Sequence, residues 1–347
     1  ALAGAAAAVV VVGIAGRDDG GDQAAGGETP TPPAQPPLGR VVATIPVDGQ
    51  PDGIAVAGNA VWVANQTSRK VTRIDASTNA VVAEVPIDSR WTSVVADVSG
   101  VWVAAPETRT IHRIDPRTNQ VVATVDLDAG RVPGNRAEGS GAISIVSGFA
   151  GIWVLDGRQL LFINPGSNMV ERWVSVDFGG NFDLAVGHES LWVTSQRDGL
   201  IRVDPVTGVA RQLGDLPEVG YGLAESNAFL WISVTAANAL LKVDTATGSV
   251  VARIELTEPG PPLATGDTVW VPLQAHDAVA RIDAMSGEVL GAIEVGDAPK
   301  GLAGGPGAVW VSDITGGRVV RIDPEEAGPA ANVQVDATST PVEPVVN

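Results

Sequence analysis

Short apolar runs separated by turn residues recur along the chain, and one run repeats almost unchanged. In seven places a tryptophan stands between two apolar residues. These tryptophans are Trp62, Trp102, Trp153, Trp192, Trp231, Trp270 and Trp310. Their successive spacings are 40, 51, 39, 39, 39 and 40 residues. A period near 40 residues that contains several strands is typical of a β-propeller blade.

A second motif keeps the same period. It reads RID, RID, FIN, RVD, KVD, RID and RID, and it ends at Asp75, Asp115, Asn164, Asp204, Asp244, Asp283 and Asp323. The first six copies open turns such as DASTN and DPVTG, in which Asp or Asn accepts backbone N–H bonds and Gly or Asn tolerates positive φ. These acidic side chains are therefore predicted to be structural. In the first unit the pattern predicts strands over Gly53–Ala57, Ala60–Ala64, Val71–Asp75 and Ala80–Ile87.

Seven such units predict an all-β fold, a seven-bladed β-propeller of four-stranded antiparallel blades. The segment Val41–Val47 precedes the first unit as a spare outer strand, whereas the seventh unit lacks the compact hairpin. We expect this N-terminal strand to complete the last blade beside Arg318–Asp323, because such closure removes an exposed sheet edge. The segment Asn332–Asp336 is the alternative. The repeated tryptophans are expected to pack between blades, and ligand stacking is the competing interpretation.

The residues before the repeat differ in composition. Residues 1–16 are apolar and uncharged, and as a helix they would span about 24 Å, less than the ~30 Å hydrocarbon core. We interpret them as the remnant of a transmembrane helix, with a signal-peptide remnant or a buried helix as alternatives. Residues 17–38 form an acidic linker rich in Gly and Pro. The propeller is predicted over 39–337 and a disordered tail over 338–347, with the propeller outside the cell membrane or secreted.

Charge and cysteine content narrow the function. Lys and Arg number 22 against 40 Asp and Glu, which gives a net charge of −18. A surface this acidic repels phosphate backbones, so nucleic acid is not an expected partner. Cysteine is absent, which excludes disulfides and thiolate metal sites. Contact with the membrane is expected through the N-terminal helix only.

The blade sequence resembles a known repeat. Gly53–Asn65 reads GIAVAGNAVWVAN, and the motif VTRIDASTNAVVAEVPI follows it. This resembles the YVTN/YncE-like propeller repeat, over about Gly39–Asp336. It also looks like the propeller ectodomains that actinobacteria attach through one membrane helix to cytoplasmic kinase or regulator domains; streptogramin B lyases and NHL-repeat sensors have similar folds. The resemblance implies a shape and leaves the function open, because propellers host many activities.

No catalytic motif stands out in the sequence. The histidines are His112, His188 and His276, and the last two are expected on opposite faces of the ring, which disfavours a shared metal site. The resemblance to streptogramin lyases would require a His/Glu cluster with Mg²⁺, and only His276 with Asp277 is roughly placed for it. We therefore predict no catalytic residue, metal or cofactor.

Candidate binding residues gather on one predicted face. In a propeller the loops between blades and the loops between second and third strands surround one mouth of the central channel. Alignment of the blades on their tryptophans places varied residues at equivalent entries into the innermost strand, and an insertion near 128–141 lengthens one such loop. The predicted ligand-binding residues are Asp52, Trp91, Thr92, Arg131, Arg136, Phe182, Tyr221, His276 and Lys300. The alternative is a flexible loop and rim aromatics that shield the channel.

These observations predict a non-enzymatic extracytoplasmic propeller, tethered to the membrane, that binds or senses a ligand. The ligand would be a small molecule, a cell-wall fragment or a protein at the central-channel face, with aromatic residues stacking on it and arginines pairing with a carboxylate. One alternative is a propeller enzyme of the streptogramin B lyase type acting at the channel mouth. The other is a structural platform for protein interactions.

Overall fold

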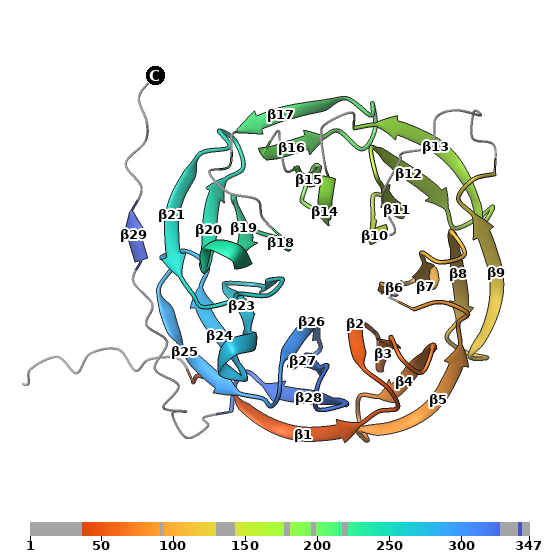
Figure 1. Ribbon diagram of the computed structural model, residues 1–347, viewed down its shortest axis with the longest axis horizontal. Coiled ribbons are helices and arrows are strands. Elements are labelled where there is room, and N and C mark those ends of the chain that lie inside the picture. Colours follow the sequence, from red (N-terminus) through yellow and green to blue (C-terminus); the bar gives the residue numbers. More distant parts are fainter. Residues whose placement is uncertain are drawn as a thin grey trace, which may run out of the picture. The chain divides into compact units, whose positions relative to one another are not determined.

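Four-stranded antiparallel sheets, seven in number, are arranged radially in a ring (Figure 1). The computed structural model describes residues 37–90, 93–129, 143–176, 181–195, 199–214, 216, 221–326 and 339–341. The predicted seven-bladed β-propeller is therefore confirmed. No helix in this described part is long and apolar enough to cross a membrane.

Each blade contributes one strand to each of four concentric positions. The innermost strands are β2 (Pro51–Ala57), β6 (Val94–Asp97), β10 (Ile143–Gly148), β14 (Asn181–Val186), β18 (Leu223–Ser226), β22 (Leu263–Thr265) and β26 (Pro299–Gly305). The second strands are β3 (Ala60–Asn65), β7 (Gly100–Ala105), β11 (Gly151–Asp156), β15 (Leu191–Ser195), β19 (Phe229–Val234), β23 (Thr268–Leu273) and β27 (Ala308–Asp313).

The third strands are β4 (Lys70–Asp75), β8 (Thr110–Asp115), β12 (Gln159–Asn164), β16 (Gly199–Val203), β20 (Ala239–Asp244), β24 (Ala278–Asp283) and β28 (Arg318–Asp323). The outermost strands are β5 (Ala80–Pro86), β9 (Gln120–Asp126), β13 (Met169–Ser175), β17 (Ala210–Gly214), β21 (Val250–Glu255), β25 (Val289–Glu294) and β1 (Arg40–Pro46). Two single-turn 3-10 helices, η1 (Thr235–Ala237) and η2 (Gln274–His276), follow β19 and β23. We number the blades from one to seven by their innermost strands, in chain order.

The ring closes through the N-terminal strand, as the sequence predicts. Strand β1 pairs antiparallel with β28, from Arg40 opposite Asp323 to Pro46 opposite Arg318. The seventh blade is thus built from both ends of the repeat region, so that unfolding one end opens a sheet edge at the other. The alternative closing segment, 332–336, lies outside the described residues.

A short strand near the C-terminus adds a fifth member to one sheet. Strand β29 (Ser339–Pro341) pairs antiparallel with β21, with Thr340 opposite Arg253. These residues belong to the stretch 338–347 that was predicted as a disordered tail, and at these three positions the prediction needs correction. The outer edge of a blade offers unpaired backbone groups, and a passing extended segment can pair with them.

The seven repeated tryptophans lie in the second strands, and each is at most 2% exposed. Each forms part of an apolar cluster shared with the next blade. Trp62 packs with Val94 and Val101 of blade two, and Trp231 packs with Val269 and Val271 of blade six. A large flat side chain fills the wedge that two twisted sheets leave between them.

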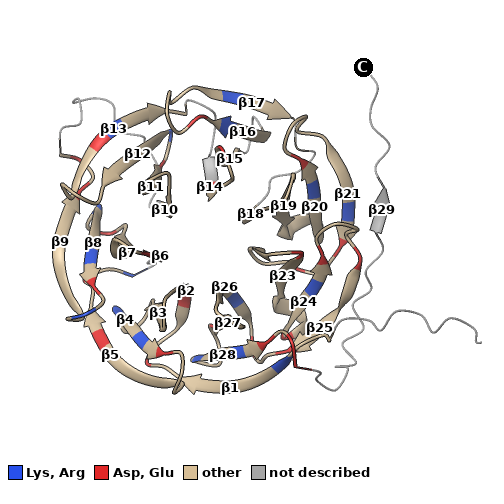
Figure 2. Ribbon diagram, turned by 180° about the vertical axis from the view of Figure 1, so that it is seen from behind, with Lys and Arg blue, Asp and Glu red and all other residues tan. Residues whose placement is uncertain are grey.

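A cation lies over every one of these indoles. The distances from the charged group to the ring centroid are 5.0–5.7 Å, within the range of cation–π attraction. In six blades the cation comes from the first position of the RID-type motif, and Figure 2 shows these basic residues as blue segments on the third strands. They are Arg73, Arg113, Arg202, Lys242, Arg281 and Arg321.

In blade three the cation comes from the adjacent outermost strand instead of the third strand. Its motif is FIN, so Phe162 occupies the position of the arginine, 5.1 Å from the Trp153 ring centroid. Arg172 stands opposite Phe162 on the adjacent strand, and it lies 5.1 Å from the Trp153 centroid and 5.3 Å from that of Phe162. The cation is therefore retained although it comes from a different strand.

Six of these seven cations also bind the next blade, whereas Arg202 bonds the Ser190 hydroxyl of its own blade. Arg73 donates to the carbonyl of Pro116 (2.6 Å) and to Oδ1 of Asn119 (2.8 Å) in the turn of blade two. Arg321 donates to Ala76 and Asn79 of blade one, and so joins the last blade to the first. Arg113, Arg172, Lys242 and Arg281 make the corresponding bonds to carbonyls of the following blade. We call this arrangement of tryptophan, cation and turn the blade clamp.

The turns that receive the clamp are held by their aspartates. Asp75 Oδ1 accepts the backbone N–H of Ser77 (3.0 Å) and of Thr78 (2.9 Å). Hydrogen bonds from these two residues lower the pKa of Asp75 to about 2. Hydrogen bonds in the equivalent turns also lower the pKa of Asp115, Asp204, Asp244 and Asp283. These carboxylates are thus ionised acceptors that shape turns.

Replacement of a clamp tryptophan should destabilise the ring strongly. We expect Trp231→Ala to lower the free energy of unfolding by about 3–5 kcal/mol, because it leaves a cavity between two blades. Trp173, which lies on β13 and is 37% exposed, provides the matched control, with an expected loss below about 1 kcal/mol. Urea unfolding followed by circular dichroism measures both, and equal losses would contradict the interblade role of the repeated tryptophans.

Candidate functional site

Strand direction separates two faces of the ring. The connections from an outermost strand to the next innermost strand lie at the same sheet ends as the loops between second and third strands. We call this side the loop face. The turns after the innermost and third strands, which include the clamped turns, lie on the opposite side, which we call the turn face.

Two predicted binding residues meet on the loop face. Lys300 of β26 and Asp52 of β2 form an ion pair with 2.9 Å between Nζ and Oδ1. The Asp52 carboxylate also accepts a hydrogen bond from Nε2 of Gln66. Ser312 of β27 donates its hydroxyl to the Asp52 carbonyl at 2.7 Å. The first two contacts hold the Asp52 side chain and the third holds its backbone at the junction of blades seven and one. The partly exposed ion pair itself contributes about 0–1 kcal/mol.

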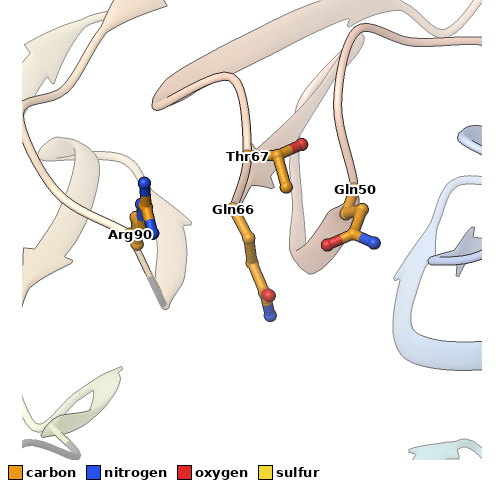
Figure 3. Close-up of a pocket in the computed structure, with 4 residues that line it drawn as sticks. All are labelled: Gln50, Gln66, Thr67 and Arg90. Carbon is orange, nitrogen blue, oxygen red and sulfur yellow. The ribbon is translucent and has the colours of Figure 1, made fainter.

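An open pocket of about 210 Å³ lies beside this junction, lined by Gln50, Gln66, Thr67 and Arg90. Gln50 precedes β2, Gln66 and Thr67 follow β3, and Arg90 belongs to the connection from β5 to β6. Gln66 lies between Gln50 and Arg90 in Figure 3. We call this site the loop-face pocket.

Backbone contacts hold the loop that carries Gln50. The N–H of Gln66 donates to the Gln50 carbonyl at 2.9 Å, and the Ser68 hydroxyl donates to the Asp48 carbonyl at 2.9 Å. Gly49 allows this close approach, because it has φ +94° and a Cβ there would lie 2.8 Å from the Ser68 oxygen. Two loops of blade one therefore pack against each other and form one wall.

Arg90 is positioned by the buried residue before it. Ser89 is fully buried, and its hydroxyl donates to the Arg90 carbonyl at 2.9 Å. The N–H of Ile87 donates to the Arg69 carbonyl at 2.8 Å, which ties this connection to blade one. The Arg90 side chain is exposed, while its backbone is fixed.

Among the residues that the structure describes, no carboxylate neutralises the charge on Arg90. Other cations on the loop face have carboxylate partners: Arg69 with Asp88 and Glu107, Lys70 with Asp48 and Glu84, Arg109 with Asp128 and Asp156, Lys300 with Asp52, and Arg318 with Asp313. Within the described part of the chain, Arg90 has no carboxylate in ion-pair range. An exposed cation beside a polar pocket favours a negatively charged ligand group.

Of the other predicted binding residues, the described Tyr221 and His276 do not line this pocket. Tyr221 begins blade five and is 46% exposed; its N–H donates to the Ser233 carbonyl at 2.7 Å. His276 belongs to η2 of blade six, where Asp277 Oδ1 accepts the N–H of Ala298 at 3.2 Å. Phe182 lies on β14, but its side chain is outside the described structure. The residues Trp91, Thr92, Arg131 and Arg136 also lie outside the described part of the chain.

The histidines are placed far from a common centre. His188 lies in the turn between β14 and β15 on the turn face, whereas His276 is on the loop face. His112, on β8, is bonded to the hydroxyls of Thr110 and Thr124, and burial lowers its pKa. Among the residues that the structure describes, no three or more His, Asp or Glu side chains are grouped to hold a metal ion.

Sequence reasoning missed the residues that line the pocket. The blade alignment selected one position in each loop, and the pocket uses neighbours of two such positions, Gln50 before Asp52 and Arg90 before Trp91. Gln66 and Thr67 follow the VWVAN motif directly. Their position just beyond the second strand places them on the loop face, and this was the signal that could have identified them.

Comparisons with solved structures show the same architecture. A structure of streptogramin B lyase has 16% sequence identity and a TM-score of 0.66, and the match covers 82% of this chain and 96% of that one. Hydrazine synthase from Kuenenia stuttgartiensis has 14% identity and a TM-score of 0.63, covering 80% and 97%. BamB from Moraxella catarrhalis has 15% identity and a TM-score of 0.59, covering 82% and 100%.

These likenesses define the class of protein as a β-propeller. At such low identity they show the fold alone. No protein-family model and no curated protein matches the chain. The narrower resemblance to the YVTN/YncE-like repeat therefore stays a prediction that rests on the blade sequence.

Proposed function

We propose that this propeller is a non-enzymatic binding or sensor domain whose ligand meets the loop face of the ring. The observation that supports the proposal is the loop-face pocket, at which Arg90 has no carboxylate partner among the described residues. Its side chains come from loops whose sequences differ between blades, while the clamp residues beneath them recur. A rigid scaffold with a diversified loop surface is typical of recognition proteins.

The proposal includes a place outside the cell membrane, with the N-terminal apolar segment as the anchor. The chain enters the propeller through β1, which begins at Arg40 opposite Asp323. That point belongs to the turn face. A ligand on the loop face would therefore approach the side of the ring opposite to the entry of the chain.

Binding at the loop face can be tested with a ligand screen and face-specific variants. We expect thermal-shift screening of the full chain against small metabolites and cell-wall fragments to yield ligands that stabilise it. The substitution Gln66→Leu should lower the apparent affinity for these ligands about tenfold, because it removes a polar group from the pocket wall. His188→Ala, on the turn face, is the matched control and should leave the affinity unchanged.

Two outcomes of that screen would contradict the proposal. Ligands that no longer bind the His188→Ala variant but still bind the Gln66→Leu variant would place binding on the turn face. Turnover of a bound compound, abolished by His276→Ala, would identify the propeller as an enzyme of the lyase type.

The proposed location has its own test. In the source cells we expect the native polypeptide to sediment with the membrane fraction, and protease added to intact cells should digest the propeller. A cytoplasmic protein measured in parallel controls for lysis. Protection of the propeller in intact cells, together with digestion after lysis, would refute the extracytoplasmic placement.

A further inference from the structure

We infer that the loop-face pocket binds a small anionic polyol, a molecule with one carboxylate or phosphate group beside several hydroxyls. The inference rests on the proposed binding function and specifies the ligand. It follows from three features of the pocket: an unpaired cation, polar groups without protein partners, and a small volume.

Arg90 supplies the site for the anionic group. Its guanidinium is exposed and lacks a carboxylate partner in the described structure, while Ser89 fixes its backbone. A guanidinium can bind a carboxylate or a phosphate through two parallel N–H bonds. The protein carries a net charge of −18, so long-range attraction favours cations. Selection of an anion here must therefore come from this local contact.

Two linked contacts orient Gln66 so that its Oε1 can accept a hydrogen bond from a ligand. Lys300 holds Asp52, and Asp52 accepts the hydrogen bond from Nε2 of Gln66. Because the Gln66 nitrogen is used in this way, its Oε1 remains to accept a hydrogen bond from a ligand hydroxyl. Gln66 is only 5% exposed, which means that this acceptor is preorganised.

Two further polar groups face the pocket without protein partners. In the described structure neither the Gln50 amide nor the Thr67 hydroxyl is engaged by another side chain. An amide and a hydroxyl can each donate and accept, as ligand hydroxyls do. Each of the four described lining residues carries a polar group that a ligand hydroxyl or anion could reach.

The pocket is small and open to the solvent. At about 210 Å³ the pocket is smaller than the roughly 300–1,000 Å³ of sites for drug-sized ligands. It suits a single sugar acid or a short polyol phosphate, or the terminal group of a longer chain that continues into the solvent.

Calorimetry with four probes tests the inference on the full chain. Glucuronate and glycerol phosphate are the anionic probes, and they separate a carboxylate ligand from a phosphate ligand. Glucose is the neutral probe and glucosamine the cationic one. We expect at least one anionic probe to bind about tenfold more tightly than glucose and glucosamine, and Arg90→Gln to remove this advantage, which corresponds to about 1.4 kcal/mol.

Matched variants separate charge from hydrogen bonding. Arg211, an arginine of the outermost strand β17, also lacks a carboxylate partner among the described residues, so Arg211→Gln is the control and should not change binding. Gln66→Leu should weaken anionic and neutral probes alike, because it removes the shared hydroxyl contact.

The inference fails if the wild-type protein binds neither anionic probe, or binds glucose as tightly as both of them. It also fails if Arg90→Gln binds the anions as the wild type does. The proposed function can survive this failure, since ligands of another class that are lost in Gln66→Leu would still place binding at the loop face. If every ligand from the screen binds the Gln66→Leu variant as tightly as the wild type, the proposed function is refuted.

Discussion

A cation placed over a buried indole and bonded to the turn of the next blade recurs around the ring. Propeller sheets splay apart toward the rim, and the tryptophan fills the resulting wedge with a side chain that is at most 2% exposed. The cation adds directional hydrogen bonds to this apolar packing. Its N–H groups donate to carbonyls in a turn of the next blade, and the aspartate of that turn accepts backbone N–H bonds. Six of the seven cations make such a bond; Arg202 instead bonds Ser190 of its own blade.

The position of the clamp explains why sequence variation is concentrated on the other side. Turns that receive a clamp need an aspartate or asparagine and a residue that tolerates positive φ, such as Asn79 or Gly208, so they can change little. The loops between second and third strands also hold one residue at positive φ, such as Arg69 or Asn238, but they receive no clamp. Gln50 and Arg90 differ from their counterparts in the other blades, whereas glutamine recurs at the position of Gln66 in blades four and six, as Gln196 and Gln274. A partly varied surface can thus develop on a constant frame.

The fold could be predicted from the sequence because its causes are local and repeated. The tryptophan period, the turn motif and the spare strand Val41–Val47 specify the blade number and the closure. The clamp could not be predicted, since an arginine in RID reads as an ordinary strand residue until the next blade is beside it. The replacement of this arginine by Arg172 depends on strand register. Of the predicted binding residues, the structure brings together Asp52 and Lys300, but the pocket depends on side-chain directions that loop alignment does not contain.

A double-mutant cycle between blades tests the clamp most directly. Arg73→Met keeps an apolar chain on Trp62 and removes the donor, and Asn119→Gly removes the acceptor while tolerating φ +57°. The account predicts a coupling in unfolding free energy of at least about 1 kcal/mol between these two substitutions. The control pair joins Arg73→Met with Asn79→Gly, whose partner is Arg321, and it should be additive. Additivity in the Arg73–Asn119 cycle would contradict the account, because it would mean that the cation does not join adjacent blades.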